Sequence, residues 1–344
     1  VAMQDRLPKL EFRSSGTVSS GQEPSSPVTT TPARQRRKIT PPAALLLHAF
    51  RAHEGPIAKA AFADNGRLIV TAGADATMKV WETSTRNLLR TIELDDGPAT
   101  ALDTQDSTAL TGHSEGVIAL WDLEAGTKSK SFKRNAANIW AVTFAGNTER
   151  FWSAGHDWEI ALWETQTPSE PLHVLKGHER AVQALAYSPA HTLLLSGGAD
   201  NQVKLWNGAG LSLLRTYGRT RDFVMSVAFS PDGDEFAVGT LDGRIRLMTR
   251  KSRRYREIRA HSGAVISLKY LTDGGGLISA SRDGFVKLWN VKRRRVIRTY
   301  GAGSRAVHAA DIAAGSGIIL SADEAGMVRL WRGVPTAERR AARK

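Results

Sequence analysis

The chain has 344 residues, 41% of them hydrophobic and 24% charged, a composition that is ordinary for a folded globular protein and excludes a wholly disordered chain. It contains no cysteine, which excludes disulfide scaffolds, thiolate zinc sites, iron–sulfur clusters and cysteine nucleophiles. The longest uncharged apolar run, residues 43–50, is too short to span a bilayer, so we expect no membrane insertion and a cytoplasmic location.

The formal net charge of +13 is concentrated at the two ends of the chain. Residues 1–42 carry net +4 and are rich in Ser, Thr and Pro, so they are predicted to form a disordered basic arm. Residues 332–344 also carry net +4 and form a short basic tail. Residues 43–331 carry the remaining +5, and there short alternating apolar runs separated by Gly and Asp turns are typical of many short strands.

A period of about 42 residues repeats through this region. Seven segments, from TAGADATMKVW at 71–81 to SADEAGMVRLW at 321–331, align without a gap. Each ends in an apolar run closed by Trp or, once, by Met, at spacings of 40, 42, 43, 42, 41 and 42 residues. The closing residues are Trp81, Trp121, Trp163, Trp206, Met248, Trp289 and Trp331.

This period, the Gly-His near the start of a repeat and the strand that ends in Trp resemble the WD-repeat family of β-propellers. The resemblance covers residues 43–331 and implies an all-β fold, a seven-bladed propeller with four antiparallel strands in each blade. In the sixth repeat the strands are expected at 264–270, 276–280, 285–290 and 295–300. The seventh repeat lacks a fourth strand after Trp331, so we expect residues 44–50 to supply it and close the ring.

Three repeats carry a His, a Ser or Thr, an Asp and the closing Trp at matching positions. In the WD-repeat family these residues resemble a structural tetrad, in which indole, hydroxyl, imidazole and carboxylate are hydrogen-bonded in series. A catalytic Ser would need an exposed position beside an oxyanion hole, whereas these hydroxyls fall within strands without a G-x-S-x-G context. We therefore expect structural tetrads and no catalytic site. Their members are His53, Thr71, Asp75 and Trp81; His178, Ser196, Asp200 and Trp206; and His261, Ser279, Asp283 and Trp289.

The other four repeats depart from this set. Repeat two has Asp95 and Glu115 at the His and Asp positions, repeat three has Asn135 for the His, repeat five has Thr220, Val238 and Met248, and repeat seven has Gly303 and Ala325. These four blades are expected to depend on packing, because an incomplete buried polar network costs more free energy than an apolar one.

Function is then expected on the face formed by the loops that carry the His positions, here called the His-loop face, which the resemblance implies as the commonest docking surface. Three positions per repeat belong to it, and the larger side chains fall in repeats three, five and six. Aromatic residues, Met and Arg are enriched in binding hot spots. The alternative is that Trp140 and Phe223 only close the mouth of the central channel or pack on neighbouring loops. The predicted partner-binding residues are Trp140, His156, Phe223, Met225, Leu241, Ile266 and Arg282, and Trp158 extends the patch.

A second candidate surface is basic. Residues 244–259 and 287–298 are dense in Arg and Lys and are predicted to lie mostly on the outer strands of blades five and six. Cations on exposed strand edges also prevent edge-to-edge pairing, so these segments fit a solvated rim as well as an anionic partner. Only Tyr255 is available for base stacking, which weakens the case for single-stranded nucleic acid. The basic rim comprises Arg250, Lys251, Arg253, Arg254, Arg256, Lys292, Arg293, Arg294 and Arg295.

The sequence thus predicts a non-catalytic WD-repeat scaffold that holds a protein or peptide on the His-loop face, within a larger complex. The alternative is binding of nucleic acid or an anionic surface by the basic rim and the tails. There is no phosphate-binding loop, zinc helix or calcium loop, and the nine histidines lack ligand spacing, so no cofactor and no metal site are expected.

Overall fold

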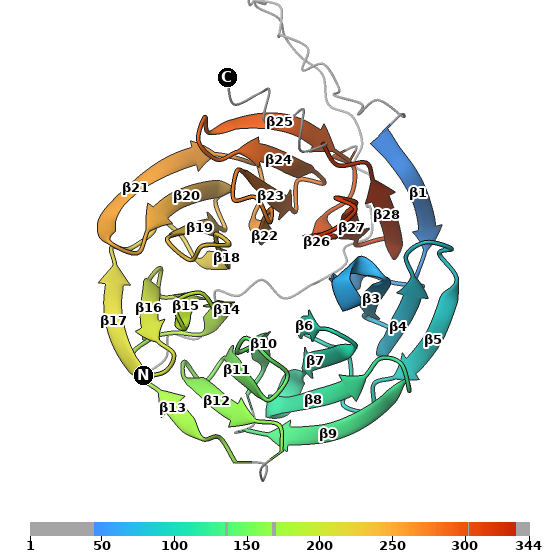
Figure 1. Ribbon diagram of the computed structural model, residues 1–344, viewed down its shortest axis with the longest axis horizontal. Helices are drawn as coiled ribbons and strands as arrows, with labels where there is room; N and C mark the ends of the chain where they lie inside the picture. Colours follow the sequence, from blue (N-terminus) through green and yellow to red (C-terminus); the bar gives the residue numbers. More distant parts are fainter. Residues whose placement is uncertain (1–44, 135–136, 167–169, 302, 335–344) are drawn as a thin grey trace, which may run out of the picture. The chain divides into compact units, whose positions relative to one another are not determined.

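The computed structural model describes residues 45–134, 137–166, 170–301 and 303–334. Seven four-stranded antiparallel sheets form a ring of blades (Figure 1). In six blades the first strand is innermost and the last outermost, and in the seventh the outermost strand is supplied from the start of the described chain. The prediction of a seven-bladed all-β propeller is confirmed. The predicted arm at 1–42, the tail from residue 335 onward and Asn135 lie outside the described residues.

Each sequence repeat forms one blade, and the strands follow the chain in order. Blade one contains β2 (Ile57–Ala63), β3 (Leu68–Gly73), β4 (Thr77–Glu82) and β5 (Leu88–Glu93), and blade two contains β6 (Ala101–Gln105), β7 (Thr108–Gly112), β8 (Val117–Asp122) and β9 (Thr127–Lys133). Blade three contains β10 (Ile139–Phe144), β11 (Arg150–Gly155), β12 (Ile160–Glu164) and β13 (His173–Leu175), and blade four contains β14 (Val182–Ser188), β15 (Leu193–Gly198), β16 (Val203–Asn207) and β17 (Ser212–Tyr217).

The remaining blades repeat this arrangement. Blade five contains β18 (Val224–Phe229), β19 (Glu235–Thr240), β20 (Arg244–Thr249) and β21 (Ser252–Arg259), and blade six contains β22 (Val265–Tyr270), β23 (Gly276–Ser281), β24 (Val286–Asn290) and β25 (Arg295–Tyr300). Blade seven contains β26 (Val307–Ile312), β27 (Ile319–Asp323) and β28 (Met327–Trp331), joined by β1 (Leu46–Arg51). Two 3-10 turns, η2 (Asp64–Gly66) and η3 (Ser114–Gly116), connect strands. Within the described ranges no helix has the length and apolar character needed to cross a bilayer.

The position of a strand within its blade determines its residue pattern. Every residue of β3, LIVTAG, is buried, because neighbouring blades cover both faces of a second strand. In β9, TKSKSFK, exposed and half-buried residues alternate before Phe132, as expected for an outermost strand with solvent along its edge. The core therefore lies between adjacent blades: Ile57 and Ile69 of blade one, for example, pack in one cluster with Leu320 of blade seven.

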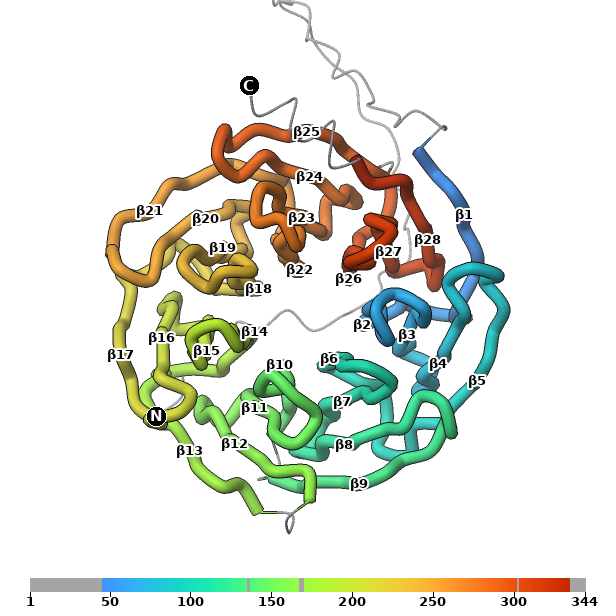
Figure 2. Tube along the Cα trace, in the orientation of Figure 1, coloured from blue at the N-terminus to red at the C-terminus, as the bar shows by residue number. Residues whose placement is uncertain are grey.

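The ends of the described chain meet in blade seven. β1 pairs antiparallel with β28, and the Phe50 ring lies 4.7 Å from that of Trp81 in blade one. The chain winds once around the ring, so its first and last described segments lie side by side (Figure 2). At the inner edge the backbone N–H of Phe62 donates to the Asp311 carboxylate at 3.0 Å, a second link between blades one and seven. Strand pairing and side-chain packing together join the two ends.

Candidate functional site

In blade one the four tetrad side chains are hydrogen-bonded in the expected order. The Trp81 indole N–H donates to Thr71 Oγ1 at 3.1 Å, Thr71 Oγ1 lies 2.8 Å from His53 Nε2, and His53 Nδ1 lies 2.9 Å from Asp75 Oδ2. An indole N–H can only donate, so the hydroxyl hydrogen is left for Nε2, and Nδ1 must carry the proton that goes to the carboxylate. The imidazole is therefore the neutral Nδ1–H tautomer.

Blades four and six contain the same network. The indole-to-hydroxyl distance is 2.8 Å and the hydroxyl-to-imidazole distance 2.7 Å in both blades, and the imidazole-to-carboxylate distances are 2.8 and 2.9 Å. In blades one and four a glycine two residues before the Asp makes room for the network: a Cβ at Gly73 would lie 2.3 Å from His53 Nδ1, and one at Gly198 would lie 2.7 Å from the Asp200 carboxylate. Blade six has Ser281 at this position.

The hydroxyls of the three tetrads cannot act as nucleophiles in this arrangement. Thr71, Ser196 and Ser279 all have 0% exposure, and each hydroxyl is held between an indole and an imidazole. A nucleophile must reach its substrate beside donors for the developing oxyanion. The tetrads therefore hold strands and loops in place.

Burial and hydrogen bonding shift the pKa values of the tetrads in opposite senses. Burial lowers the pKa of His53 and His261, and the bonds to their carboxylates offset this only in part. Burial alone would raise the pKa of Asp75, but hydrogen bonds from Thr77 and His53 outweigh it and hold that pKa below its ordinary value. Neutral imidazole beside ionised carboxylate is therefore the favoured state at neutral pH.

The prediction that the four departing blades depend on packing is wrong for blade two. Thr111 accepts from the Trp121 indole at 2.8 Å and lies 2.8 Å from His113 Nε2, and His113 Nδ1 lies 2.8 Å from the Gly97 carbonyl oxygen. The imidazole comes from the turn after the second strand instead of the loop before the first. A backbone carbonyl takes the role of the Asp.

Blades three and seven also keep polar networks. In blade three Trp163 donates to Ser153 at 2.8 Å, while the buried Arg134 forms ion pairs of 2.9 Å with Asp157 and 2.7 Å with Glu159. In blade seven the Trp331 indole donates to a serine hydroxyl, and Asp323 pairs with an arginine of β28. Asp323 also accepts the backbone N–H of Ala325 at 2.9 Å, so the carboxylate missing at 325 is supplied two residues earlier.

Only blade five among the departing blades follows the packing prediction. Val238 and Met248 replace the hydroxyl and the indole, and both are buried. The nearby Arg246 is buried as well and lies 3.0 Å from the Glu257 carboxylate. Because hydroxyl and indole are lost together, neither leaves an unpaired polar partner.

At the His-loop face the first strand of most blades contains one extra residue. Within the described residues, the register between first and second strands shifts at this point in six of the seven blades. A bulge takes its extra residue out of the ladder and redirects the side chain. The six extra residues are Ala58, Trp140, Gln183, Met225, Ile266 and His308.

The structure brings the predicted partner-binding positions of one blade together. The Leu241 backbone N–H donates to the Phe223 carbonyl at 3.0 Å, and an equivalent bond of 2.9 Å ties His156 to the loop before β10. Trp140, Phe223, Met225, Leu241 and Ile266 are half-buried, His156 and Arg282 are exposed, and Trp158 is 49% exposed. The inner strands of blades three to six adjoin in order, and blade four, with small side chains, lies between the larger groups (Figure 1).

The basic rim is divided by the structure into paired and solvated cations. Arg250 is half-buried and pairs with the Asp234 carboxylate at 2.5 Å, so it is not a free cation of the rim. The other eight predicted rim residues are exposed. They are Lys251, Arg253, Arg254, Arg256, Lys292, Arg293, Arg294 and Arg295.

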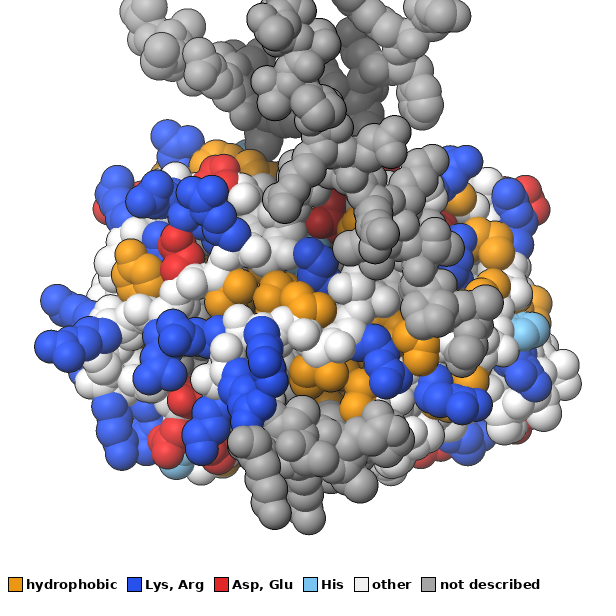
Figure 3. Space-filling model, turned by 90° about the horizontal axis from the view of Figure 1, so that it is seen from above, with side chains coloured by type: hydrophobic (Ala, Val, Ile, Leu, Met, Phe, Trp, Pro, Cys, Tyr) orange, Lys and Arg blue, Asp and Glu red, His pale blue; other side chains and the backbone are white. Residues whose placement is uncertain are grey.

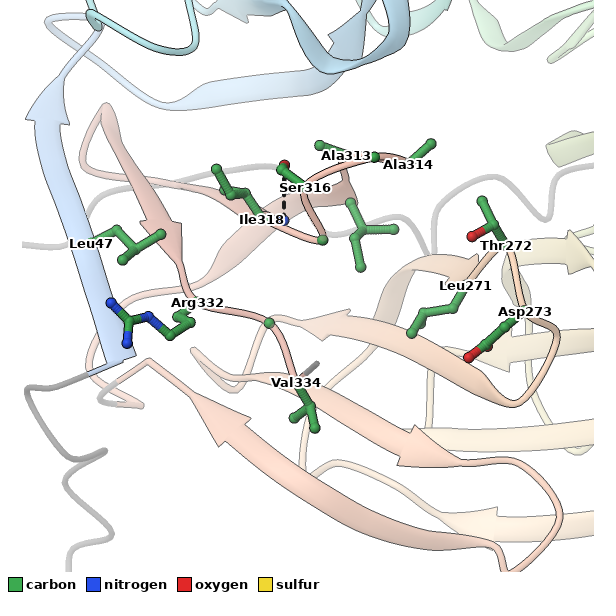
Figure 4. Close-up of a pocket in the computed structure, with 14 residues that line it drawn as sticks. Leu47, Leu271, Thr272, Asp273, Ala313, Ala314, Ser316, Ile318, Arg332 and Val334 are labelled. Atoms are coloured by element: carbon green, nitrogen blue, oxygen red, sulfur yellow. Dashed lines mark hydrogen bonds between the residues drawn. The ribbon is translucent and has the colours of Figure 1, made fainter. Parts of the chain in front are cut away.

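A pocket of about 440 Å³ lies between blades six and seven, near the closure of the ring. It is lined by loops that join first to second strands, at the end of the blades opposite the His-loop face, and by Leu47 of β1. Among the described lining residues the charged side chains are Asp273 and Arg332, which lie on opposite sides of the pocket (Figure 4). The pocket brings no pair of catalytic groups together.

Sequence reasoning missed the side chains that complete the altered networks. His113 lies two residues after its hydroxyl, and Arg134 lies directly before the position where a His was expected. A signal existed in blade three, where Arg134 and the acidic residues of the turn after β11 supply opposite charges near the ends of the same strands. In blade two no such charge pattern distinguishes His113 from a loop histidine.

Two family models match this chain. The model for the IFT122 first beta-propeller matches residues 99–339, and that for the WD domain, G-beta repeat, matches residues 45–82. Periodic tryptophan protein 2 of Arabidopsis thaliana is 25% identical over 274 residues, which cover 70% of this chain and 29% of the relative. The Protein LST8 homolog of Drosophila melanogaster is 26% identical over 234 residues, covering 64% of this chain and 75% of the relative. The Ribosome biogenesis protein WDR12 homolog of Anopheles gambiae is 33% identical over 120 residues, which cover 33% of this chain and 28% of the relative.

Proposed function

Because this chain belongs to the WD-repeat family of β-propellers, we propose that it is a non-catalytic scaffold that binds a protein or peptide on its His-loop face, over blades three to six. The buried tetrad hydroxyls favour a scaffold over an enzyme, since they offer no accessible nucleophile. The ring is closed by the pairing of β1 with β28, so its loops are held in fixed positions. Loops that are already ordered lose less conformational entropy when a partner binds.

The bulge near the start of the first strand, found in every described blade except blade two, carries the proposal. In these six blades it takes one residue out of the ladder at the His-loop end, and in blades three, five and six this residue is large: Trp140, Met225 and Ile266. We take these side chains as the contacts for the partner. In blades one and four the same position holds Ala58 and Gln183. Since buried area grows with side-chain size, a partner gains most on the arc from blade three to blade six.

Site-specific crosslinking tests where the partner docks. A photoreactive amino acid at exposed position 156 lies on the proposed arc, and the same amino acid at Leu214, 52% exposed on β17, serves as the control on the outer edge. In native lysate, position 156 should capture a discrete protein that position 214 does not. Capture of the same proteins from both positions, or from 214 alone, would contradict docking on the His-loop face.

The strength of the contact is tested with the captured protein as purified ligand. Trp140→Ala and Met225→Ala should each weaken binding at least tenfold, because truncating a central anchor costs about 2 kcal/mol or more. Leu214→Ala is the matched control and should leave the affinity unchanged. The melting temperature of each variant shows that the ring is intact. Unchanged affinity in both Trp140→Ala and Met225→Ala would contradict the proposal.

A further inference from the structure

The net positive charge of the propeller is concentrated in one part of the ring. Residues 244–259 carry net +7 and residues 287–298 carry net +6, and together they supply +13. Residues 43–331 carry only +5 in total, so the rest of this region is net −8. The two segments form the outer half of blades five and six. Figure 3 views the ring from the side of β25, and there Lys and Arg side chains clearly outnumber Asp and Glu. The molecule is therefore strongly polarised.

Local acids neutralise only the inner members of this cluster. Glu257 pairs with both Arg244 and Arg246, and Asp234 pairs with Arg250. Nine further cations are exposed and have no acidic partner within ion-pair distance among the described residues. They are Lys251, Arg253, Arg254, Arg256, Arg259, Lys292, Arg293, Arg294 and Arg295, here called the solvated basic rim.

Protection of the strand edge does not account for so many cations. Charged side chains on an exposed edge discourage edge-to-edge pairing, as do short strands, Pro and bulges. The outermost strands β5, β17 and β1 each contain a single Arg and also expose leucines, such as Leu88 and Leu213. β9 contains three Lys, of which only Lys133 is exposed. β21 alone contains four. An excess on two adjacent blades calls for a function that the other blades lack.

The placement of these cations suits a long polyanion. Lys251 and residues 292–294 lie in the turns that join third to fourth strands, so both groups are at the same end of their blades. β21 and β25 then continue the charge along the outside of the ring (Figure 1). A peptide paired with the edge of β21 would reach only one of the two blades. A chain of regularly spaced anions that follows the rim would contact both.

We propose that the solvated basic rim binds the phosphate backbone of a nucleic-acid duplex without reading its bases. Seven of the nine cations are Arg, whose planar guanidinium can donate two parallel hydrogen bonds to a phosphate. Tyr255, 49% exposed, is the one large aromatic side chain exposed on the described part of these outer strands, so stacking on splayed single-stranded bases has little support. Contacts to backbone phosphates fix a protein on a duplex but carry no sequence information.

The test is fluorescence anisotropy of the full chain with two labelled 20-base-pair DNA duplexes of unrelated sequence, at several salt concentrations. The two affinities should agree within about twofold, and log K should fall linearly with log salt. Arg253→Glu with Arg293→Glu should weaken binding at least tenfold and reduce the salt slope by about 1.8, since each lost phosphate contact removes about 0.9. Arg86→Glu with Lys133→Glu changes the net charge equally but lies in blades one and two, and should change the affinity less than threefold.

Several outcomes would overturn the proposal. Equal losses in the two double variants would mean that total charge, and not the rim, attracts the duplex. Undiminished binding by the rim variant would place the contact elsewhere on the chain, the basic terminal segments included. Rim-dependent binding of polyglutamate or of phosphatidylserine vesicles, with no binding of either duplex, would assign the rim to an acidic protein or a membrane. Trp140→Ala should bind the duplexes like the unchanged protein, which separates this proposal from docking on the His-loop face.

Discussion

At the scale of single residues, what recurs around the ring is a paired indole and hydroxyl, while the remaining polar groups vary. Thr111 is completed by His113 and a carbonyl, whereas in blade three the carboxylate of Asp157 is met by Arg134. An unpaired buried polar group costs about 1 to 3 kcal/mol, and each closing Trp has kept a hydroxyl acceptor on the neighbouring strand. Blade five needs no such acceptor because Met248 replaces the indole.

The buried imidazoles make stability depend on pH. Burial lowers the pKa of His53, His113, His261 and His308, so the folded state takes up protons less readily than the unfolded chain. Each group therefore stabilises the fold fully above pH of about 6.5 and loses that contribution as pH falls toward its lowered pKa, at up to about 1.4 kcal/mol per pH unit. Urea unfolding at pH 7.5 and pH 5.5 should show a lower free energy of unfolding at pH 5.5.

A variant identifies the groups responsible. His53→Gln with His261→Gln should be less stable at pH 7.5, because two hydrogen-bond networks are broken, but its stability should change less between the two pH values. Leu214→Ala on the outer strand β17 offers the control, since it removes no titratable group and should leave the change of stability with pH as it was. If the free energy of unfolding changes as much between the two pH values in the double variant as in the unchanged protein, the acid sensitivity arises from other groups.

At the scale of strands, the sequence predicts what repeats and misses what is exceptional. In blade six the expected ranges agree with β22 to β25 within one residue at each end, because Gly and Asp turns and the closing Trp289 fix the boundaries. The three complete tetrads were also predictable, since their four residue types recur at constant spacing. The bulges were not: the extra residue, such as Trp140, is apparent only when the register of the two paired strands is known.

Blade seven depends on a strand from the other end of the chain, which gives a prediction about β1. Deleting residues 1–42 should leave stability nearly unchanged, whereas deleting 1–51 also removes β1, uncovers the edge of β28 and takes Phe50 from Trp81. Loss of a packed Phe alone costs about 3 kcal/mol or more, so the melting temperature of the longer deletion should fall by roughly 5 to 10 °C. Light scattering should show aggregation of that variant only. Identical melting curves for the two deletions would show that β1 contributes little to the closed ring.

At the scale of the whole molecule, the propeller separates two surfaces of different character. The proposed arc on the His-loop face lies at the innermost strands, where bulges take Trp140, Met225 and Ile266 out of the ladder. The solvated basic rim lies on the outermost strands β21 and β25 and in the turns that precede them. Two further strands stand between the innermost and outermost strand of a blade, so the surfaces are about 14 Å apart at a strand spacing of about 4.8 Å. A rigid ring of this kind could hold two ligands at once.

The two surfaces should therefore act independently. Effects of changes more than about 7 to 10 Å apart usually add within about 0.5 kcal/mol, because no side chain is shared between them. A variant that combines Met225→Ala with Arg253→Glu and Arg293→Glu should lose affinity for the protein captured at position 156 by the factor of Met225→Ala alone. Its loss of duplex affinity should equal that of the rim variant. The affinity of each variant for each ligand is measured by titration, and the free-energy changes of the separate and combined variants are compared. A departure from additivity above about 0.5 kcal/mol would mean that blade five transmits a change from its inner strand to its outer one.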